Sequence, residues 1–444
     1  MGNYVVRVFA KYLSDCQTIQ ENKVKIKSPK RVLMSNKPTY SNWKSLRDEI
    51  QPKWKENCLF NQIDTHQKGY VKILDEDRMN PNDRMLGLVK GKGFDRVGHG
   101  PLFNWAIPYL GGSNFWKFCY DGIETGWASI NTWLRTGGTD FLPSGFGLAA
   151  YSLPWFDSHS RFYYEWTYPS DFLFPQFIEK EILKTYDDLY NYGMSGLAQT
   201  ITKRMMRDFI LMLRELYYMG KVNKYYFGPI ESQFFPYAQL LFATWDILPM
   251  WRSMVPFMKD MRKKPEIVVE ALEFLNKPMT DFMVSIGKLT KAKSALIGNS
   301  RGSNSWISPK MFENIYWPSM KYTITKCLDN GIVPFCHFDN NWTENMSFLA
   351  EHLPKRSCVF HLDQVDLVKV HEITNDKFCL MGGMSPALLV GGSTDQVQEE
   401  TKRYIENIGK DGLIIASGCE IPANIPIKNL YAQKRAIMKY GFIL

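Results

Sequence analysis

The stretch VPFCHFDNNW, from Val333 to Trp342, is an apolar run that ends in an imidazole, a carboxylate and two amides. Four further short apolar runs lie in the C-terminal half of the chain, at residues 294–299, 357–363, 377–383 and 412–419. Helix-like segments separate the runs, and one of them, 393–409, opens with a Ser/Thr cap signal and closes at a glycine. The order is therefore strand, helix, strand, helix.

This alternation decides the fold class. Repeated strand–helix units with continuously apolar strands form a parallel sheet that helices cover. Neither G-x-G-x-x-G nor G-x-x-x-x-G-K follows any of the runs, which disfavours a nucleotide-binding fold. We therefore expect an α/β fold of the (β/α)8 TIM-barrel type. Helical patterns, with apolar residues at three- and four-residue spacing, dominate residues 175–290.

The N-terminal part has a different composition. Residues 1–90 are polar, basic and irregular, and residues 1–60 carry twelve Lys and Arg against five Asp and Glu. We expect a basic N-terminal extension over 1–90 and the barrel over 91–444. Such an arm attracts nucleic acid, anionic lipid or an acidic protein, or it is a solvated face that aids solubility. No zinc-finger, RNA-recognition or basic-zipper signature is present, so we expect no nucleic-acid partner.

The sequence also bears on location. No apolar run approaches the roughly 18 to 20 residues of a membrane span, and the start MGNYVVRVFAKYL lacks a signal-peptide core. The eight cysteines are scattered and form no C-x-x-C pair, which is typical of reduced thiols. We expect a cytoplasmic protein with no membrane partner. The oligomeric state, a homodimer included, stays open.

Polar side chains follow the predicted strands where barrel enzymes carry their chemistry, at the C-terminal strand ends. In chain order they are Asn299 with Arg301, His337 with Asp339, His361 with Asp363, Gly382 with Gly383, and Cys419 with Glu420. Imidazole, carboxylate and thiol are all ligands of Zn²⁺, and an open coordination position makes such a site catalytic. We therefore expect a zinc site with mixed ligands at the barrel mouth.

His337 and Asp339 are the predicted catalytic pair. Residues two apart on a strand project to the same side, so both point into the mouth, as two ligands or as ligand and base. Alone, a histidine at a strand end is more often a hydrogen-bonded structural residue, and a single cysteine such as Cys419 is more often a small buried one. Their joint placement on different strand ends favours the metal site.

Three segments, 307–342, 381–405 and 411–432, resemble the uroporphyrinogen decarboxylase superfamily. More narrowly, they resemble its branch of cobamide-dependent methyltransferases. The resemblance begins weakly at GFDRVGHGPLF, residues 93–103, and is most specific over the last 140 or so residues. It implies a (β/α)8 barrel.

The resemblance also implies a zinc ion held by a His-x-Cys pair at one strand end and a cysteine at a later one. His337 matches the histidine, Asp339 stands where thiol-activating members have a cysteine, and Cys419 matches the late cysteine. One of three further side chains would complete the shell: His361, Asp363 or Glu231.

Methyl transfer in this branch requires a corrinoid. The corrinoid-binding signature D-x-H-x-x-G does not occur, because the stretch DSHSRF at 157–162 lacks the final glycine. The cobalamin would then arrive on a separate corrinoid protein. The decarboxylase itself binds a substrate with many carboxylates through an R-Q-A-G-R motif. Here the corresponding stretch, 95–116, has a single arginine, which disfavours decarboxylation.

The residues expected at the barrel mouth indicate which kind of methyl donor the protein uses. Aromatic residues make up 14% of the chain and suit a flat apolar substrate, although most aromatics are packing residues. The expected substrate-binding residues are His361, Asp363, Asn299, Arg301 and Trp342. An aspartate ligand leaves zinc a harder Lewis acid, which favours cleavage of an ether over activation of a thiol.

We therefore expect O-demethylation of an aromatic methyl ether, with the methyl group passing to the Co(I) of the corrinoid. The alternatives are a methylcorrinoid:thiol or folate methyltransferase, a porphyrin enzyme like the decarboxylase, and a barrel that only binds a ligand or partner.

Overall fold

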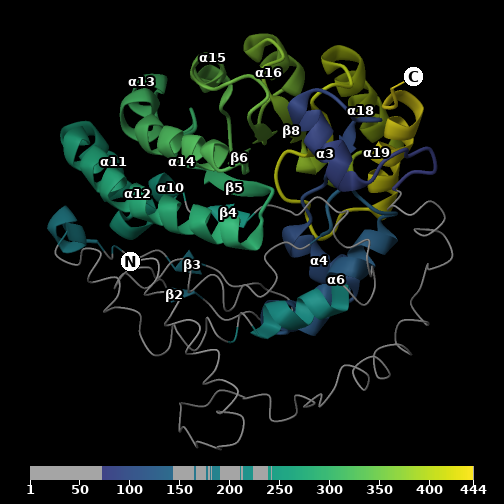
Figure 1. Cartoon of the computed structure of the whole chain (residues 1–444), viewed down its shortest axis with the longest axis horizontal. Helices are drawn as coiled ribbons and strands as arrows, with labels where there is room; N and C mark the ends of the chain where they lie inside the picture. Colours follow the sequence, from purple (N-terminus) through teal and green to yellow (C-terminus); the bar gives the residue numbers. More distant parts are fainter. Residues whose placement is uncertain are drawn as a thin grey trace, which may run out of the picture. The chain divides into compact units, whose positions relative to one another are not determined.

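The computed structural model describes residues 73–143, 165–166, 177–178, 181, 183–190, 211, 214–223, 239–241 and 243–443. Within this part of the chain, seven parallel strands form one sheet (Figure 1). They are β1 (Gly98–His99), β4 (Gln239–Leu241), β5 (Ser294–Asn299), β6 (Val333–Phe338), β7 (Val359–Leu362), β8 (Cys379–Met384) and β9 (Leu413–Ser417). The five predicted apolar runs correspond to β5 through β9.

The strand order identifies the sheet as a barrel wall. It reads β1-β9-β8-β7-β6-β5-β4, so the last strand pairs in parallel with the first, with Gly98 opposite Ile414. Pairing of the last strand with the first is how a barrel closes. The predicted (β/α)8 TIM-barrel fold is confirmed. Between β1 and β4, much of the chain lies outside the described residues. A separate antiparallel pair joins β2 (Glu165–Trp166) to β3 (Phe177–Ile178).

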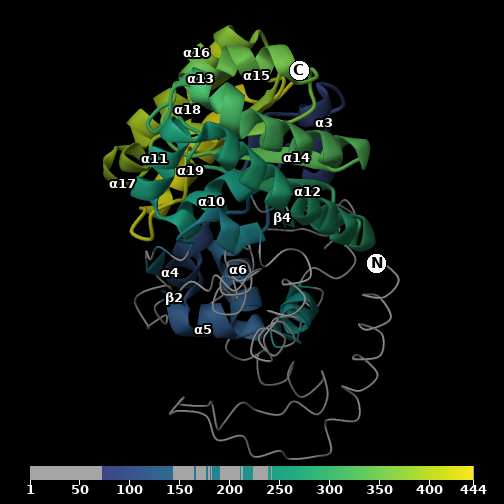
Figure 2. The same cartoon turned by 90° about the vertical axis from the view of Figure 1, so that its left-hand side faces the viewer.

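Helices cover the outside of the strands (Figures 1 and 2). α12 contacts β4, α14 contacts β6, α16 contacts β8 and α18 contacts β9. The α-helices of the barrel are α3 (Pro81–Lys90), α4 (Ile107–Gly111), α5 (Phe115–Tyr120), α6 (Gly122–Arg135), α10 (Thr244–Arg252), α11 (Met254–Lys263), α12 (Pro265–Thr290), α13 (Pro309–Met311), α14 (Trp317–Asp329), α15 (Met346–His352), α16 (Leu367–Thr374), α17 (Pro386–Gly391), α18 (Thr394–Ile408) and α19 (Ile427–Tyr440).

Local sequence explains where α18 begins and ends. The Ser393 hydroxyl accepts from the backbone of Gln396, whose side chain accepts from the backbone of Ser393 in return, which is a capping box. Gly409 follows the last turn with φ 92°, a conformation that favours glycine. Both ends therefore lie where the sequence predicted them.

Two apolar clusters separate the inside of the barrel from its outer layer. Alternate residues of the strands, such as Phe335, Val359 and Ile414, form the inner cluster. Their neighbours along the strands pack with the helices in the larger outer cluster. Met85 and Leu88 of α3 belong to the inner cluster, so α3 packs against the inner layer of the barrel. The interior is a packed core, as in other barrels.

The boundary between the N-terminal unit and the unit that contains the barrel precedes α3 in the sequence. The chain forms two compact units, Met1–Cys58 and Leu59–Leu444, and the first of them lies outside the described residues. α3 precedes the predicted boundary at residue 91 and is packed as part of the barrel unit. The division into a 1–90 extension and a 91–444 barrel stays a prediction.

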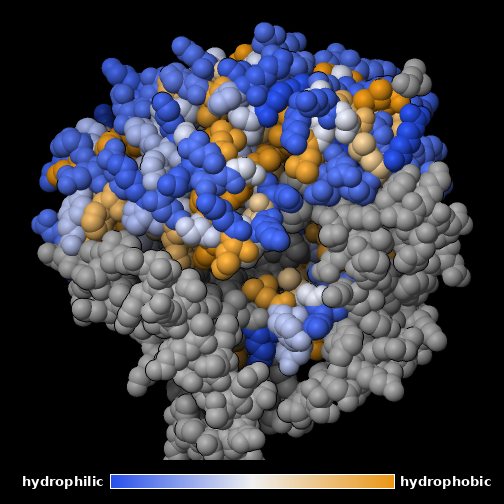
Figure 3. All heavy atoms as spheres, in the orientation of Figure 1, coloured by the Kyte–Doolittle hydropathy of each residue, from blue (hydrophilic) through white to orange (hydrophobic). Residues whose placement is uncertain are grey.

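The outer surface of the helices is largely hydrophilic in the view of Figure 3, with hydrophobic residues scattered among polar ones. Within the described ranges, no helix combines the length and the apolar character that a membrane span needs.

Candidate metal centre

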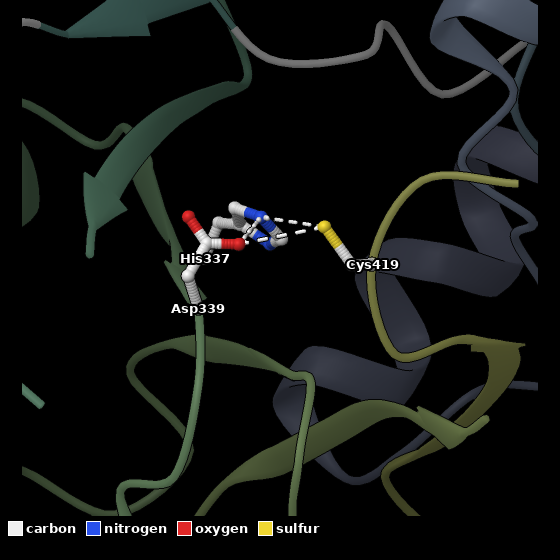
Figure 4. A group of neighbouring side chains, drawn as sticks. All are labelled: His337, Asp339 and Cys419. Atoms are coloured by element: carbon white, nitrogen blue, oxygen red, sulfur yellow. Dashed lines mark hydrogen bonds and ion pairs between the residues drawn. The ribbon is translucent and has the colours of Figure 1, made fainter. Parts of the chain in front are cut away.

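Two strand ends bring three possible metal ligands together. His337 lies on β6 two residues after Phe335, so it faces the inside of the barrel, and Asp339 follows two residues later on the same side. Cys419 follows β9, on the other side of the site (Figure 4). The three side chains come from segments 80 residues apart and point toward one another.

The distances between the ligand atoms fit one small ion. The Nε2 atom of His337 lies 3.0 Å from Oδ1 of Asp339 and 3.9 Å from Sγ of Cys419. The Cys419 thiol lies 3.4 Å from the same Oδ1. In tetrahedral zinc sites, bonds of about 2.0 to 2.3 Å imply ligand–ligand distances of roughly 3.3 to 3.8 Å. The side chains of His337 and Asp339 are 13% and 30% exposed, so a ligand can reach them.

The donor set also fits a cation electrostatically. Burial alone lowers the pKa of His337, but the hydrogen bond and charge of Asp339 outweigh it and raise that pKa overall. Burial alone raises the pKa of Asp339, yet His337 and Ser300 bring it well below its usual range. Burial and the negative charge of Asp339 raise the pKa of the Cys419 thiol. Protons thus occupy His337 and Cys419 where a metal ion would replace them.

A second histidine lies behind the first. His361 of β7 pairs with His337 of β6, and their Nδ1 atoms are 2.9 Å apart. The Nε2 atom of His361 lies 2.8 Å from the main-chain oxygen of Ser417 at the end of β9. Burial and the charge of His337 lower the pKa of His361 to about 3, which keeps its ring neutral at pH 7.

Asp339 is held by the loop that follows β5. The Ser300 hydroxyl donates to Oδ2 of Asp339 at 2.6 Å. Asp246, in the first turn of α10, accepts from the backbone N–H groups of Ser300 and Arg301 at 2.9 and 2.8 Å. Burial raises the pKa of Asp246 to about 6. The carboxylate of Asp246 therefore fixes the backbone from which Ser300 reaches the site.

The other predicted residues take different positions. Asp363 lies beside the site, where its Oδ2 accepts from the backbone of Asn340. The guanidinium of Arg301 lies over the ring of Trp306, 5.0 Å from its centroid, in the loop after β5. Both remain candidates for substrate binding. Glu231, a predicted metal ligand, lies outside the described residues.

Three predicted substrate-binding residues support the site from behind instead. His361 is fully buried, so it contacts His337 and not a substrate. Asn299 is fully buried. It faces the outer layer, because Gly298 is the β5 residue that pairs with His337. The Asn299 amide donates to the His337 carbonyl at 3.3 Å. Trp342 is 1% exposed, and its indole N–H donates to the Asp339 carbonyl at 2.8 Å.

Sequence reasoning missed Asp246, Ser300 and Asn104, and it gave Glu420 no role. Asp246 follows β4, and the strand-end rule would have found it had this three-residue strand been recognised. Glu420 was noted at its strand end but given no role; its Oε1 accepts from the amide of Asn104 at 2.7 Å, and burial raises its pKa to about 7. Asn104 has φ 30°, unusual for a residue with a side chain, and no sequence signal marks it.

The family model of uroporphyrinogen decarboxylase (URO-D) matches residues 242–440. This range contains all three converging side chains, and the match confirms the predicted resemblance to the uroporphyrinogen decarboxylase superfamily. A solved structure, a methyltransferase from Methanosarcina mazei, is similar in fold with a TM-score of 0.63 and 16% sequence identity. The similarity covers 82% of this chain and 99% of that one. The comparison with curated proteins found no match.

Proposed function

We propose that the protein is a zinc-dependent methyltransferase. It moves the methyl group of a small aromatic methyl ether to the Co(I) of a corrinoid that a separate protein carries. The observation that carries the proposal is the set of ligand atoms of His337, Asp339 and Cys419, all within 4.8 Å of one another at the barrel mouth. The fold likeness to a methyltransferase and the sequence resemblance to the cobamide-dependent branch supply the reaction class.

Each residue has a stated task in this proposal. Bound zinc would supply a Lewis acid for cleavage of the ether bond. His337, Asp339 and Cys419 would hold the ion. Ser300 orients the Asp339 carboxylate through its 2.6 Å hydrogen bond. The single thiolate in the donor set favours ether cleavage, because two thiolates would donate more charge to the ion.

Substrate contacts are proposed for the exposed part of the mouth. Trp306 is 39% exposed and stacks with the guanidinium of Arg301. This pair offers a flat surface and a positive charge to an aromatic ring that carries a polar group. Asp363 offers a carboxylate on another side of the metal site.

The cofactor carrier and the location are part of the same proposal. The chain has no corrinoid-binding signature, so a separate corrinoid protein would dock over the barrel mouth. A cytoplasmic location agrees with the scattered cysteines of the sequence, which form no C-x-x-C pair.

The test is a panel of methyl donors assayed against reduced cobalamin, with and without a chelator. We expect aromatic methyl ethers to methylate cobalamin and the chelator to stop the reaction. His337→Ala and Cys419→Ala should abolish transfer and reduce zinc well below one ion per chain. His352→Ala, on α15 outside the barrel, is the matched control and should keep both.

Asp339→Cys separates the two reaction types. It should retain zinc while weakening ether cleavage, because a second thiolate makes the ion a poorer Lewis acid. Undiminished ether cleavage in all three site variants would refute the mechanism. Methyl uptake from methylcobalamin by a thiol or folate, without cobalamin methylation, would establish the alternative transferase. Ligand binding without any turnover would establish a binding protein.

A further inference from the structure

His361 lies where no substrate reaches it, yet both of its ring nitrogens have a close partner. The residue is fully buried behind His337. Its Nδ1 lies 2.9 Å from Nδ1 of His337, and its Nε2 lies 2.8 Å from the main-chain oxygen of Ser417. Both distances are those of hydrogen bonds, so each contact needs one donor and one acceptor.

The chemistry of the partners determines the direction of both hydrogen bonds. A carbonyl oxygen only accepts, so Nε2 of His361 carries a proton and donates it to Ser417. In a neutral ring the other nitrogen then accepts, and Nδ1 of His337 is the donor of the 2.9 Å contact. The opposite arrangement would place two lone pairs 2.8 Å apart, at His361 and Ser417.

The consequence falls on the nitrogen that faces the site. With its proton on Nδ1, a neutral His337 has its lone pair on Nε2, the atom 3.0 Å from Asp339 and 3.9 Å from Cys419. A metal ligand must present a lone pair, so the two hydrogen bonds select the tautomer that can bind.

The strands fix the positions of the three residues that form these two hydrogen bonds. His337 and His361 are paired residues of β6 and β7, and Ser417 is the last residue of β9. Ser417 also lies two residues before Cys419. The strand end that supplies the thiol therefore also supplies the acceptor that orients the histidine ligand from behind.

We propose that His361 is a positioning residue of the metal site: as a hydrogen-bond acceptor, it holds His337 in the tautomer and ring orientation that present Nε2 to the ion. This inference rests on the proposed zinc site. Hydrogen-bond partners of ligand histidines typically change metal affinity 10- to 100-fold when they are removed. His361 touches neither the ion nor the substrate in this role.

Two substitutions of the same branched shape separate the acceptor from the packing. His361→Asn offers an amide oxygen to Nδ1 of His337, whereas His361→Leu offers a methyl group; neither reaches Ser417. Zinc affinity would be measured by competition with a chromophoric chelator, together with the melting temperature of each metal-free protein. We expect His361→Leu to bind zinc at least about tenfold more weakly, and His361→Asn to stay within roughly threefold of the unaltered chain.

Equal zinc affinity in the two variants, whether retained or lost, would overturn the role of the acceptor. A second measurement covers variants that fold poorly. Two-bond ¹H–¹⁵N correlations in the unaltered metal-free protein should show His361 protonated on Nε2 and bare on Nδ1, and the opposite tautomer would overturn the proposal. Failure of the unaltered chain to bind zinc would refute the proposed zinc site, while the tautomer measurement would still stand by itself.

Discussion

Gly382, the first of two successive glycines of β8, makes room for the buried histidine. Gly382 and Gly383 have φ of 99° and 71°, where residues with side chains are strained. A Cβ on Gly382 would lie 2.4 Å from the Leu362 carbonyl oxygen and 2.9 Å from Cδ2 of His361. Gly382 in the stretch MGGM therefore supports the candidate metal site, although it supplies no ligand.

Gly382→Ala is expected to destabilise the protein and weaken zinc binding together. The strained φ alone costs about 1 to 3 kcal/mol, and the added methyl group displaces His361. Gly391→Ala, where a Cβ would meet no atom within 4 Å, is the control and should change neither quantity by much. Urea unfolding and chelator competition measure the two effects. A Gly382→Ala protein as stable as the control would show that β8 relaxes without cost.

At the same scale, the sequence predicted which residues meet but not which side some of them face. His337, Asp339 and Cys419 were expected together because alternation along one strand and convergence of strand ends are general rules. Asn299 was expected to bind substrate, but its side chain faces the outer layer. Gly298, and not Asn299, is the β5 residue that pairs with His337 and faces the inside of the barrel. That register depends on packing of the whole sheet and leaves no local signal.

Among the elements, the loop between β5 and α13 connects α10 to the site. Asp246 accepts two backbone N–H groups of this loop, and Ser300 of the loop then bonds Asp339. Asp246→Ala should lower the free energy of unfolding by about 1 to 3 kcal/mol, because two partly buried donors lose their acceptor. It should also weaken zinc binding severalfold.

Ser300→Ala distinguishes positioning from stability. It removes only the 2.6 Å hydrogen bond to Asp339, so zinc affinity should fall while the unfolding curve stays nearly unchanged. Chemical denaturation and chelator competition on both variants provide the comparison. Unchanged zinc affinity in Asp246→Ala would contradict the role of Asp246, because it would show that the loop keeps its position without this carboxylate.

Element prediction succeeded where apolar runs are long enough to be seen. β5 to β9 have four to six residues each and were all expected. β1 and β4 have two and three residues, and they are strands only because neighbouring strands pair with them. The helices expected between 190 and 240 lie largely outside the described residues.

For the whole molecule, a buried ion-pair network ties the first segment of the barrel to the rest. Arg84 and Arg96 are fully buried and bond three carboxylates, Asp77, Asp95 and Asp140. Arg96→Met should destabilise the protein by about 3 to 5 kcal/mol, because it leaves buried carboxylates without a counter-charge. Urea unfolding at pH 7 measures this loss, and a loss below about 1 kcal/mol would contradict the role given to Arg96.

The same network predicts an acid sensitivity. Burial alone would raise the pKa of Asp140, but Arg96 and Arg84 lower it to about 2, below the usual 3.8. Its contribution to stability is thus present above about pH 4 and is lost as the pH falls toward 2, roughly 2 kcal/mol in total. The gap in unfolding free energy between the unaltered chain and Asp140→Asn should shrink over that interval. A gap independent of pH would contradict the lowered pKa.

The basic N-terminal arm is expected to act at the level of the assembly. If residues 1–60 attract an acidic corrinoid protein, deleting 22–30 should slow turnover with that partner, and added salt should reduce the difference. Turnover with free cobalamin should not change. Equal loss in both assays would point to a role in folding.

The central claim is that one zinc ion is bound by a nitrogen, an oxygen and a single sulfur at the barrel mouth. Zinc-edge X-ray absorption on the stoichiometrically loaded protein tests it most directly. The account predicts one sulfur neighbour at about 2.3 Å, with the remaining neighbours nitrogen or oxygen at about 2.0 to 2.2 Å. Cys419→Ala should remove the sulfur signal. A shell without sulfur, or one with two or more sulfur atoms, would contradict the site built from His337, Asp339 and Cys419.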